Sequence, residues 1–281
     1  MSKKISSNAP EMTPVKGISY DSYLMLEQLL DCQHRISDPP HHDEMLFIIQ
    51  HQTSELWFKL ILHEIEAAIG FIQQDHLEPC FKILSRVKSI QQQLFNQWAV
   101  LETLTPSEYV QFRGVFGNAS GFQSRQYREF EFRLGNKNMR FIDLHGGVTS
   151  VNGERLDRIA RAPSLYDEFL RFLSRKGFEV PADRVNRDWR LPYEGHAGVV
   201  QVFKVIYDNP RKHWDSYDMC EKLVDIEENL QLWRHRHMRT VARIIGFKRG
   251  TGGSSGVNFL KKVLDVSLFP ELIDVRTEIG K

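Results

Sequence analysis

The feature that most constrains this chain is a helical repeat of apolar residues. Over residues 215–246 such residues recur at intervals of three and four, the spacing that places side chains on one face of an α-helix. The same period dominates elsewhere, and no segment keeps a two-residue alternation for long. With 41% hydrophobic and 11% aromatic residues the chain can build a sizeable core. The sequence therefore predicts an all-α fold.

The expected helices are bounded by capping residues and by proline. Thr105-Pro-Ser-Glu108 and Ser120-Gly-Phe-Gln123 have the pattern of a capping box, and each is expected to open a helix. The helix after residue 42 is expected to bury Phe47, Leu56 and Leu60. The predicted helices cover residues from near 19 through 30, then about 42–70, 79–101, 105–117, 120–135, 164–176 and 215–246.

Glycine and proline divide the chain into regions. They break residues 136–210 into short pieces with one clear helix, 164–176, so this region is interpreted as a helical insertion beside a core formed by residues 18–135 and 211–281. Residues 1–17 lack an apolar stretch and are expected to form a flexible arm without a secretory signal.

Composition excludes several classes of partner and location. The net charge of +1 gives no reason to expect nucleic acid or an acidic membrane as partner, and no apolar run approaches the ~18 residues of a membrane span. Cys32, Cys80 and Cys220 form no CxxC or CxxCH motif, so neither a disulfide framework nor covalent haem attachment is expected. A reducing cytoplasm fits this cysteine usage.

His237 lies in the apolar stripe of the long C-terminal helix. Such a histidine is either a core residue with one hydrogen bond or an axial ligand of haem iron, since a neutral imidazole on an apolar wall suits a proximal site. The basic residues of the same helix and its exit form either a solvated face or a site for haem propionates. They are Arg234, His235, Arg236, Arg239, Arg243, Lys248 and Arg249.

A second group of polar residues begins with His41-His42-Asp43-Glu44. Adjacent helical residues point about 100° apart, so these four cannot converge on one metal ion, and a non-haem iron site is disfavoured. Phe47 and His51 share one face a turn apart. They suit either a core or a pocket for a flat ligand with one polar N–H.

Arg113 and the glycine-rich segment GTGGSSG (250–256) complete the candidates. Tyr109 and Ser120 flank Arg113, whose guanidinium matches a carboxylate bidentately, although surface Arg–Tyr packing is equally compatible. The glycine segment follows a helix, whereas a dinucleotide-binding turn must follow a strand. We interpret it as a mobile lid in which Thr251 meets a small polar ligand.

Taken together, these segments closely resemble one family, tryptophan 2,3-dioxygenase. The similarity extends from about Ile18 to Phe269, and its motifs occur in the family's order. They are HHDEMLFIIQHQTSELWFK (41–59), FRGVFGNASGFQSRQYREFEFRLGNK (112–137), WRHRHMRTVARIIG (233–246) and GTGGSSG (250–256). One departure is Phe116, where the family usually has leucine.

The resemblance implies a role for each candidate residue. His237 corresponds to the proximal iron ligand, and His51 to the catalytic distal histidine that hydrogen-bonds the indole N–H. Arg113 corresponds to the arginine that grips the substrate carboxylate. The other substrate-binding positions are Phe47, Ile48, Ile49, Gln50, Tyr109 and Thr251, and the other cofactor-binding positions are Phe116, Ser120 and Trp233.

The resemblance also implies the cofactor, the reaction and the assembly. The expected enzyme uses non-covalent haem b, ferrous when active, and converts L-tryptophan and O₂ to N-formyl-L-kynurenine, the first step of kynurenine-pathway degradation. A homotetramer is implied, in which Tyr20, Tyr23 and Leu24 complete the neighbouring subunit's pocket. A haem-based oxygen carrier or sensor and a haem-free helical interaction protein are the alternatives.

Overall fold

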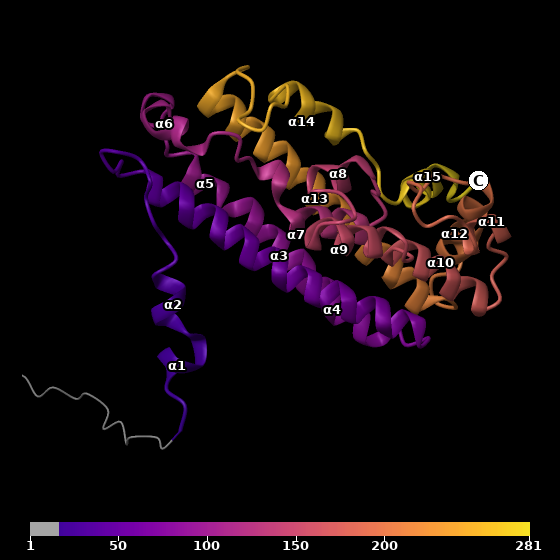
Figure 1. Ribbon diagram of the computed structural model, residues 1–281. Coiled ribbons are helices and arrows are strands. Elements are labelled where there is room, and N and C mark those ends of the chain that lie inside the picture. Colours follow the sequence, from indigo (N-terminus) through magenta and orange to yellow (C-terminus); the bar gives the residue numbers. More distant parts are fainter. Residues whose placement is uncertain (1–16) are drawn as a thin grey trace, which may run out of the picture.

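The computed structural model describes residues 17–281, and throughout that part of the chain every regular element is a helix (Figure 1). The all-α prediction is confirmed. The α-helices are α1 (Tyr20–Leu24), α2 (Leu26–Leu30), α3 (Glu44–Gln73), α4 (Glu78–Asn96), α5 (Trp98–Leu101), α6 (Pro106–Phe112), α7 (Arg125–Arg133), α8 (Arg140–Leu144), α9 (Val151–Ala160), α10 (Leu165–Arg175), α11 (Ala182–Val185), α12 (Ala197–Asp208), α13 (Trp214–Ile245), α14 (Val257–Leu264) and α15 (Pro270–Glu278). Two short 3₁₀ helices, η1 (Arg113–Phe116) and η2 (Gly121–Gln123), precede α7.

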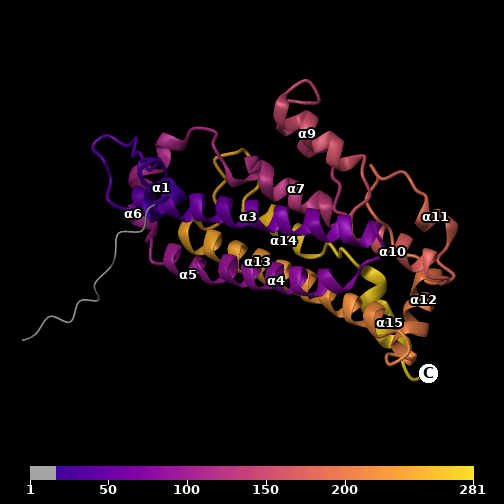
Figure 2. The same ribbon diagram turned by 90° about the horizontal axis from the view of Figure 1, so that it is seen from below.

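Three long helices form the body of the molecule. Both α3 and α13 pack along α4, and Figure 2 shows the three running side by side. The reason is the apolar spacing of each sequence: Ile61, Ile65 and Ile72 of α3 are fully buried, as are Leu223 and Ile226 of α13. Burying apolar surface at about 25 cal/mol per Å² is the main force that holds such helices together.

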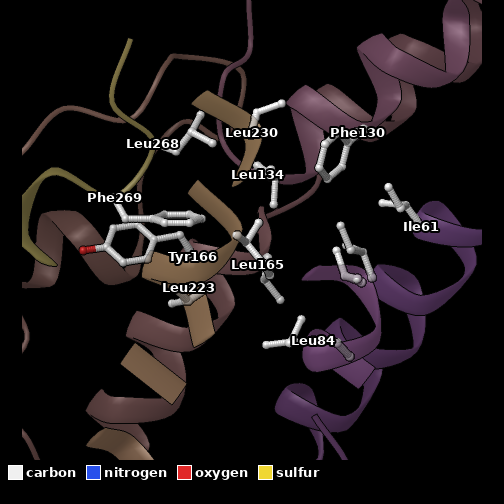
Figure 3. Close-up of a cluster of buried hydrophobic side chains, with 14 of the residues drawn as sticks. Ile61, Leu84, Phe130, Leu134, Leu165, Tyr166, Leu223, Leu230, Leu268 and Phe269 are labelled. Atoms are coloured by element: carbon white, nitrogen blue, oxygen red, sulfur yellow. The ribbon is translucent and has the colours of Figure 1, made fainter. Parts of the chain in front are cut away.

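The main hydrophobic core draws on distant parts of the sequence. In Figure 3, Ile61 of α3, Leu84 of α4 and Phe130 of α7 point toward Leu165 of α10 and Leu223 of α13. The predicted insertion thus supplies side chains to the same core as the long helices, although its limits, 136 and 210, remain a prediction. A smaller cluster around Phe132 and Phe141 joins α7 to α8 and α9.

The N-terminal helices stand apart from this body. α1 and α2 bury no residue, and Figure 1 shows them projecting from the end of α3 opposite to α12 and α15. Met25, with a left-handed φ of 51°, separates them, so the single helix expected from Ser19 is two short ones. Residues 1–16 of the predicted arm lie outside the described residues.

The predicted capping boxes are confirmed, but the helix opened by the second one is shorter than expected. Thr105 and Glu108 close a reciprocal pair of hydrogen bonds at the start of α6, and Ser120 with Gln123 does the same. Such caps contribute about 1 kcal/mol each. Ser120 opens only the three residues of η2, however, because Ser124 adopts an extended conformation and caps α7 itself.

Three further expectations were wrong in detail. Leu56 is half exposed, because the buried face of α3 turns away from it. The helix expected over 79–101 ends at Asn96 and restarts as α5. Within 136–210 the ten-residue α9 and twelve-residue α12 join the one helix that was anticipated.

Among residues 17–281, no helix combines the length and apolar character that a membrane crossing requires.

Candidate active site

A cavity of about 520 Å³ lies where α3 and α13 face each other beyond the main core. Its remaining walls come from α5, from α6 and α7 with the segment between them, and from the glycine-rich loop with α14. Aromatic and aliphatic side chains dominate the lining, and a few polar groups interrupt it. This size and character are typical of a site for a small molecule or a cofactor.

His51 lines the cavity from α3 in a defined tautomer. Its Nδ1 lies 2.7 Å from the carbonyl oxygen of Phe47, and because a carbonyl can only accept, Nδ1 carries the hydrogen. The lone pair therefore resides on Nε2. Burial lowers the pKa of His51, although the bond to Phe47 and the charge of Glu55 oppose the shift. The ring is a neutral hydrogen-bond acceptor at ordinary pH.

An aromatic wall continues from His51. The ring of Phe47 lies 4.1 Å from the imidazole and stacks on Phe116 with centroids 4.7 Å apart. Tyr109 lies 5.9 Å from Phe47 and closes the same surface. Burial raises the pKa of Tyr109, whereas the charge of Arg113 opposes that rise. The wall offers flat apolar contact beside one nitrogen acceptor, as an indole-like ring would need.

His237 belongs to α13 and lines the side of the cavity opposite to His51. Its imidazole lies against two indoles, with centroids 4.9 Å from Trp98 and 5.5 Å from Trp233. Burial, helped by repulsion from His51 when that ring is protonated and from Arg128, lowers the pKa of His237 to about 4. The ring is therefore neutral at physiological pH, which is the form that binds a metal.

Arg113 and the glycine-rich loop meet at one margin of the cavity. The Arg113 Nη2 donates to the carbonyl of Arg249, while its buried Nε has no partner among the described residues. Thr251 donates to the carbonyl of Ala119. Gly252 permits this approach, since a Cβ there would lie 2.6 Å from the Ser120 Cβ. The loop is held against the site by two of the predicted ligand-binding residues.

Buried ion pairs support the wall formed by α7. Arg234 is only 4% exposed. Its Nη2 donates to Glu131 at 2.7 Å, and its Nε donates to the Tyr127 hydroxyl at 3.2 Å. Arg128 also pairs with Glu131 and packs 3.7 Å over the Phe141 ring. The basic run of α13 is thus not one solvated face: Arg234 is buried in this network, whereas Arg239 and Arg243 are exposed.

Most of the residues predicted for the site line this one cavity. They are Phe47, His51, Tyr109, Arg113, Phe116, Ser120, Trp233, His237 and Thr251. Ile48, Ile49 and Gln50 do not line it, because α3 turns them away; Ile49 is 47% exposed. Tyr20, Tyr23 and Leu24 are exposed on α1, apart from the cavity of the same chain.

The cavity also contains residues that the sequence did not single out. Trp98 and Arg128 line it, and the indole N–H groups of Trp98 and Trp233 are buried without a partner in the described residues. Trp98 was expected only as part of an apolar helix face, and Arg128 only as part of a motif. Across residues 17–281, no three His, Cys, Asp or Glu side chains gather as a metal-binding group.

Comparison with known proteins accounts for this combination of residues. The family profile described as tryptophan 2,3-dioxygenase matches residues 5–177 and 173–279. A tryptophan 2,3-dioxygenase of Serratia proteamaculans is 62% identical over 265 residues, 94% of each chain. The chain belongs to the tryptophan 2,3-dioxygenase family.

Other members of the family give the same result. The tryptophan 2,3-dioxygenase of Myxococcus xanthus is 60% identical over 93% of this chain and 89% of its own, and that of Kineococcus radiotolerans is 55% identical over 94% and 92%. The resemblance inferred from the four motifs is confirmed. Members of the tryptophan 2,3-dioxygenase family are enzymes, so the chain is one too.

Proposed function

We propose that the chain is a haem-dependent dioxygenase that cleaves the indole C2–C3 bond of L-tryptophan with O₂ and yields N-formyl-L-kynurenine. Family membership supports the reaction and its two substrates. The observation that carries the assignment of the site is the cavity between α3 and α13, where neutral His51 and His237 occur with an aromatic wall and Arg113.

The residues of the cavity fit a haem. His237 would hold the iron, because it presents a neutral imidazole on an apolar wall. The Nε1 of Trp233 and the Nε of Arg128 are buried donors without a partner among residues 17–281, and they suit the carboxylates of a porphyrin. We propose haem b, bound without a covalent link and ferrous in the active state. When bound, the haem supplies the redox chemistry with dioxygen, which no side chain can provide.

The chain itself binds and orients the substrate. His51 accepts the indole N–H on Nε2, the nitrogen that its bond to Phe47 leaves unprotonated, and Phe47 packs on the indole ring. An indole N–H is too weak an acid for a neutral imidazole to deprotonate readily, so His51 orients the substrate and does not act as an obligatory base. Fixing the indole in this way makes an intermolecular encounter an oriented one.

The amino-acid end of the substrate is bound at the opposite margin. Arg113 takes the carboxylate, which replaces the Arg249 carbonyl as acceptor at Nη2, with Tyr109 in support. Ser120 and Thr251 lie where the glycine-rich loop contacts the segment before α7, and they bind the ammonium and carboxylate groups. Closure of that loop excludes water from the reacting atoms.

The proposed assembly is a homotetramer with shared sites. Tyr20 and Tyr23 are about three-quarters exposed, and α1 and α2 project from the body (Figure 1). Together with Met25 and Leu30, these exposed side chains gather apolar surface on two short helices, which is typical of a contact with another chain. We propose that Tyr20, Tyr23 and Leu24 complete the neighbouring subunit's site, and that the enzyme works in the cytoplasm, where its three free cysteines stay reduced.

One pair of measurements tests this function. The haem-loaded enzyme should consume O₂ only when L-tryptophan is present, and N-formyl-L-kynurenine should accumulate in equal amount. An oxygen carrier or sensor would bind O₂ reversibly without that dependence, and a haem-free interaction protein would acquire no Soret band.

His237→Ala tests the assignment of the iron ligand. The variant should lose histidine ligation and activity together, with folding checked by circular dichroism. A variant that keeps a five-coordinate, histidine-ligated spectrum would mean that another histidine, His235 being the nearest in sequence, holds the iron.

A further inference from the structure

The orientation of His237 depends on packing. Among residues 17–281 no hydrogen bond reaches its imidazole, and the closest ring against it is Trp98, nearly parallel at an interplanar angle of 15°. Trp98 belongs to α5, a helix of only four residues. α5 follows α4 directly after Gln97, which keeps helical dihedral angles, so the indole is carried near the end of a long helical run, where helices fray. An attachment at this end therefore helps to fix Trp98 against His237.

Glu102, the residue that ends α5, supplies that attachment. Its Oε1 accepts from Arg236 Nε at 3.2 Å and from Thr240 Oγ1 at 2.9 Å, and its Oε2 accepts from Arg236 Nη2 at 3.1 Å. Both partners lie on α13, one residue before His237 and three residues after it. One carboxylate thus joins the end of α5 to the turn of α13 that carries the imidazole.

The backbone completes a rigid connection from Glu102 back to Trp98. The Glu102 N–H donates to the carbonyl of Trp98 at 2.8 Å, so side chain and indole belong to one turn. Arg236 also donates from Nη1 to the Phe95 carbonyl at 3.2 Å and packs 4.6 Å over the Phe95 ring. Arg236 therefore contacts Phe95, before Trp98 in the chain, and Glu102, after it.

We propose that Glu102 is the positioning residue for His237: it holds Trp98 against the imidazole and so fixes the direction in which that ring faces the cavity. The inference rests on the proposed function, in which His237 holds the haem iron. The two side chains of the Glu102–Arg236 pair are 26% and 22% exposed. A bidentate pair of this kind also contributes to global stability, so an effect at the haem is judged against the loss of a second interhelical ion pair.

The test compares Glu102→Ala with a matched control on the same long helix. Asp225→Asn removes the charge from the 2.8 Å ion pair that joins Lys88 of α4 to α13, a pair of similar exposure and twelve residues before His237. Haem dissociation from the full-length holoenzyme to an excess of a haem-scavenging protein is measured. Glu102→Ala should release haem about 10- to 100-fold faster than the wild type, as is usual when a residue supporting a metal ligand is removed. The control should stay within about twofold.

A second set of variants separates positioning from general weakening. Glu102→Gln keeps the shape and one acceptor oxygen and should fall between wild type and Glu102→Ala, and Arg236→Lys should resemble it because lysine cannot bind bidentately. The ferrous Soret band should broaden or shift in the same order, while the thermal midpoint of the haem-free forms should change no more than in Asp225→Asn.

Two results would overturn the inference. One is equal haem dissociation in Glu102→Ala and Asp225→Asn, and the other is a loss of haem that merely follows a loss of thermal stability. Either can be told apart from failure of the proposed function, because in that case the wild type would bind no haem or His237→Ala would keep its histidine-ligated spectrum.

Discussion

The two imidazoles of the cavity are neutral for the same reason and differ in their neighbours. Burial lowers the pKa of both, His237 to about 4. His51 is bound to the carbonyl of Phe47, whereas His237 lies against two indoles that also contact each other. Because only His51 has its hydrogen fixed on Nδ1, only His51 has an Nε2 committed to accepting a hydrogen bond.

His51→Ala should lower activity without abolishing it. The substrate would lose one neutral hydrogen bond, and a net loss of about 1 kcal/mol corresponds to roughly a fivefold fall in kcat/KM. Steady-state kinetics with L-tryptophan checks this, with the haem content measured for each preparation. Complete inactivity with full haem content would make His51 an obligatory proton acceptor, and loss of haem would mean that the roles of the two histidines are exchanged.

Arg113→Ala should have the larger effect. Truncating a charge that pairs with the substrate carboxylate costs ~2–5 kcal/mol, and the loss should appear in kcat/KM for L-tryptophan. Arg113→Lys is the matched control, since it keeps the charge and loses the bidentate fork. Unchanged kinetics in Arg113→Ala would remove this residue from the site.

Sequence patterns revealed those side chains whose local setting is unusual. His237 interrupts an apolar stripe, and Arg113 follows a well-capped helix, so both could be singled out without coordinates. Trp98 and Glu102 could not be, because their roles depend on residues of α13 more than 130 positions later, as the bond from Arg236 to Glu102 shows. A tryptophan in an apolar helix face looks the same whether it packs in a core or against a ligand.

At the scale of elements, the segment before α3 is tied to its first turn by Glu44. This buried carboxylate accepts from the backbone N–H of Ile36 at 2.8 Å, from that of Ser37 at 3.1 Å, and from the Ser37 hydroxyl. Burial alone would raise its pKa, but these hydrogen bonds outweigh burial and lower it. The contact places the segment that leads from α2 to α3.

The lowered pKa of Glu44 has a defined consequence for stability. A carboxyl whose pKa falls on folding stabilises the folded state above its ordinary value of 4.5, and that contribution is lost as the pH falls through the folded-state value. Glu44→Gln should therefore be less stable than wild type near neutrality, and the difference should shrink on acidification below pH 4.5. Denaturant unfolding at a series of pH values measures this; a constant difference would contradict it.

Periodicity predicted the long elements well and the short ones poorly. The helices expected over 42–70 and 215–246 are α3 and α13, because many buried residues repeat along each. The break at Gln97 carries no proline or glycine, and α9 and α12 were obscured by the glycines and prolines around them. Such helices are fixed by packing against α7 and α15, which local sequence does not reveal.

At the scale of the whole molecule, the exposed N-terminal helices predict that each subunit contributes its N-terminal segment to the site of a neighbouring subunit. A double variant, Tyr20→Ala with Tyr23→Ala, should have little activity, because it gives its neighbour an incomplete site. His237→Ala subunits are inactive themselves but carry an intact N-terminal segment. Refolding the two together should restore measurable activity, since intact segments then reach intact haem sites.

The mixing experiment has an internal control. The same two proteins mixed without unfolding should remain inactive as long as subunits do not exchange, and size-exclusion chromatography should give one assembly size throughout. If co-refolded mixtures stay inactive while wild type refolds with full activity, each site is made by a single chain.

Two sides of the cavity are formed by long helices, and a third is formed by short segments. α3 and α13 each continue as a single helix from the cavity into the main core, whereas the closing side consists of η1, η2 and the glycine-rich loop. Changes of side-chain size or loop length within residues 113–123 and 247–256 should be accommodated locally, whereas changes along α3 or α13 should disturb the main core. Directed evolution toward bulkier indoles should therefore accumulate its changes in those two stretches and leave the scaffold untouched.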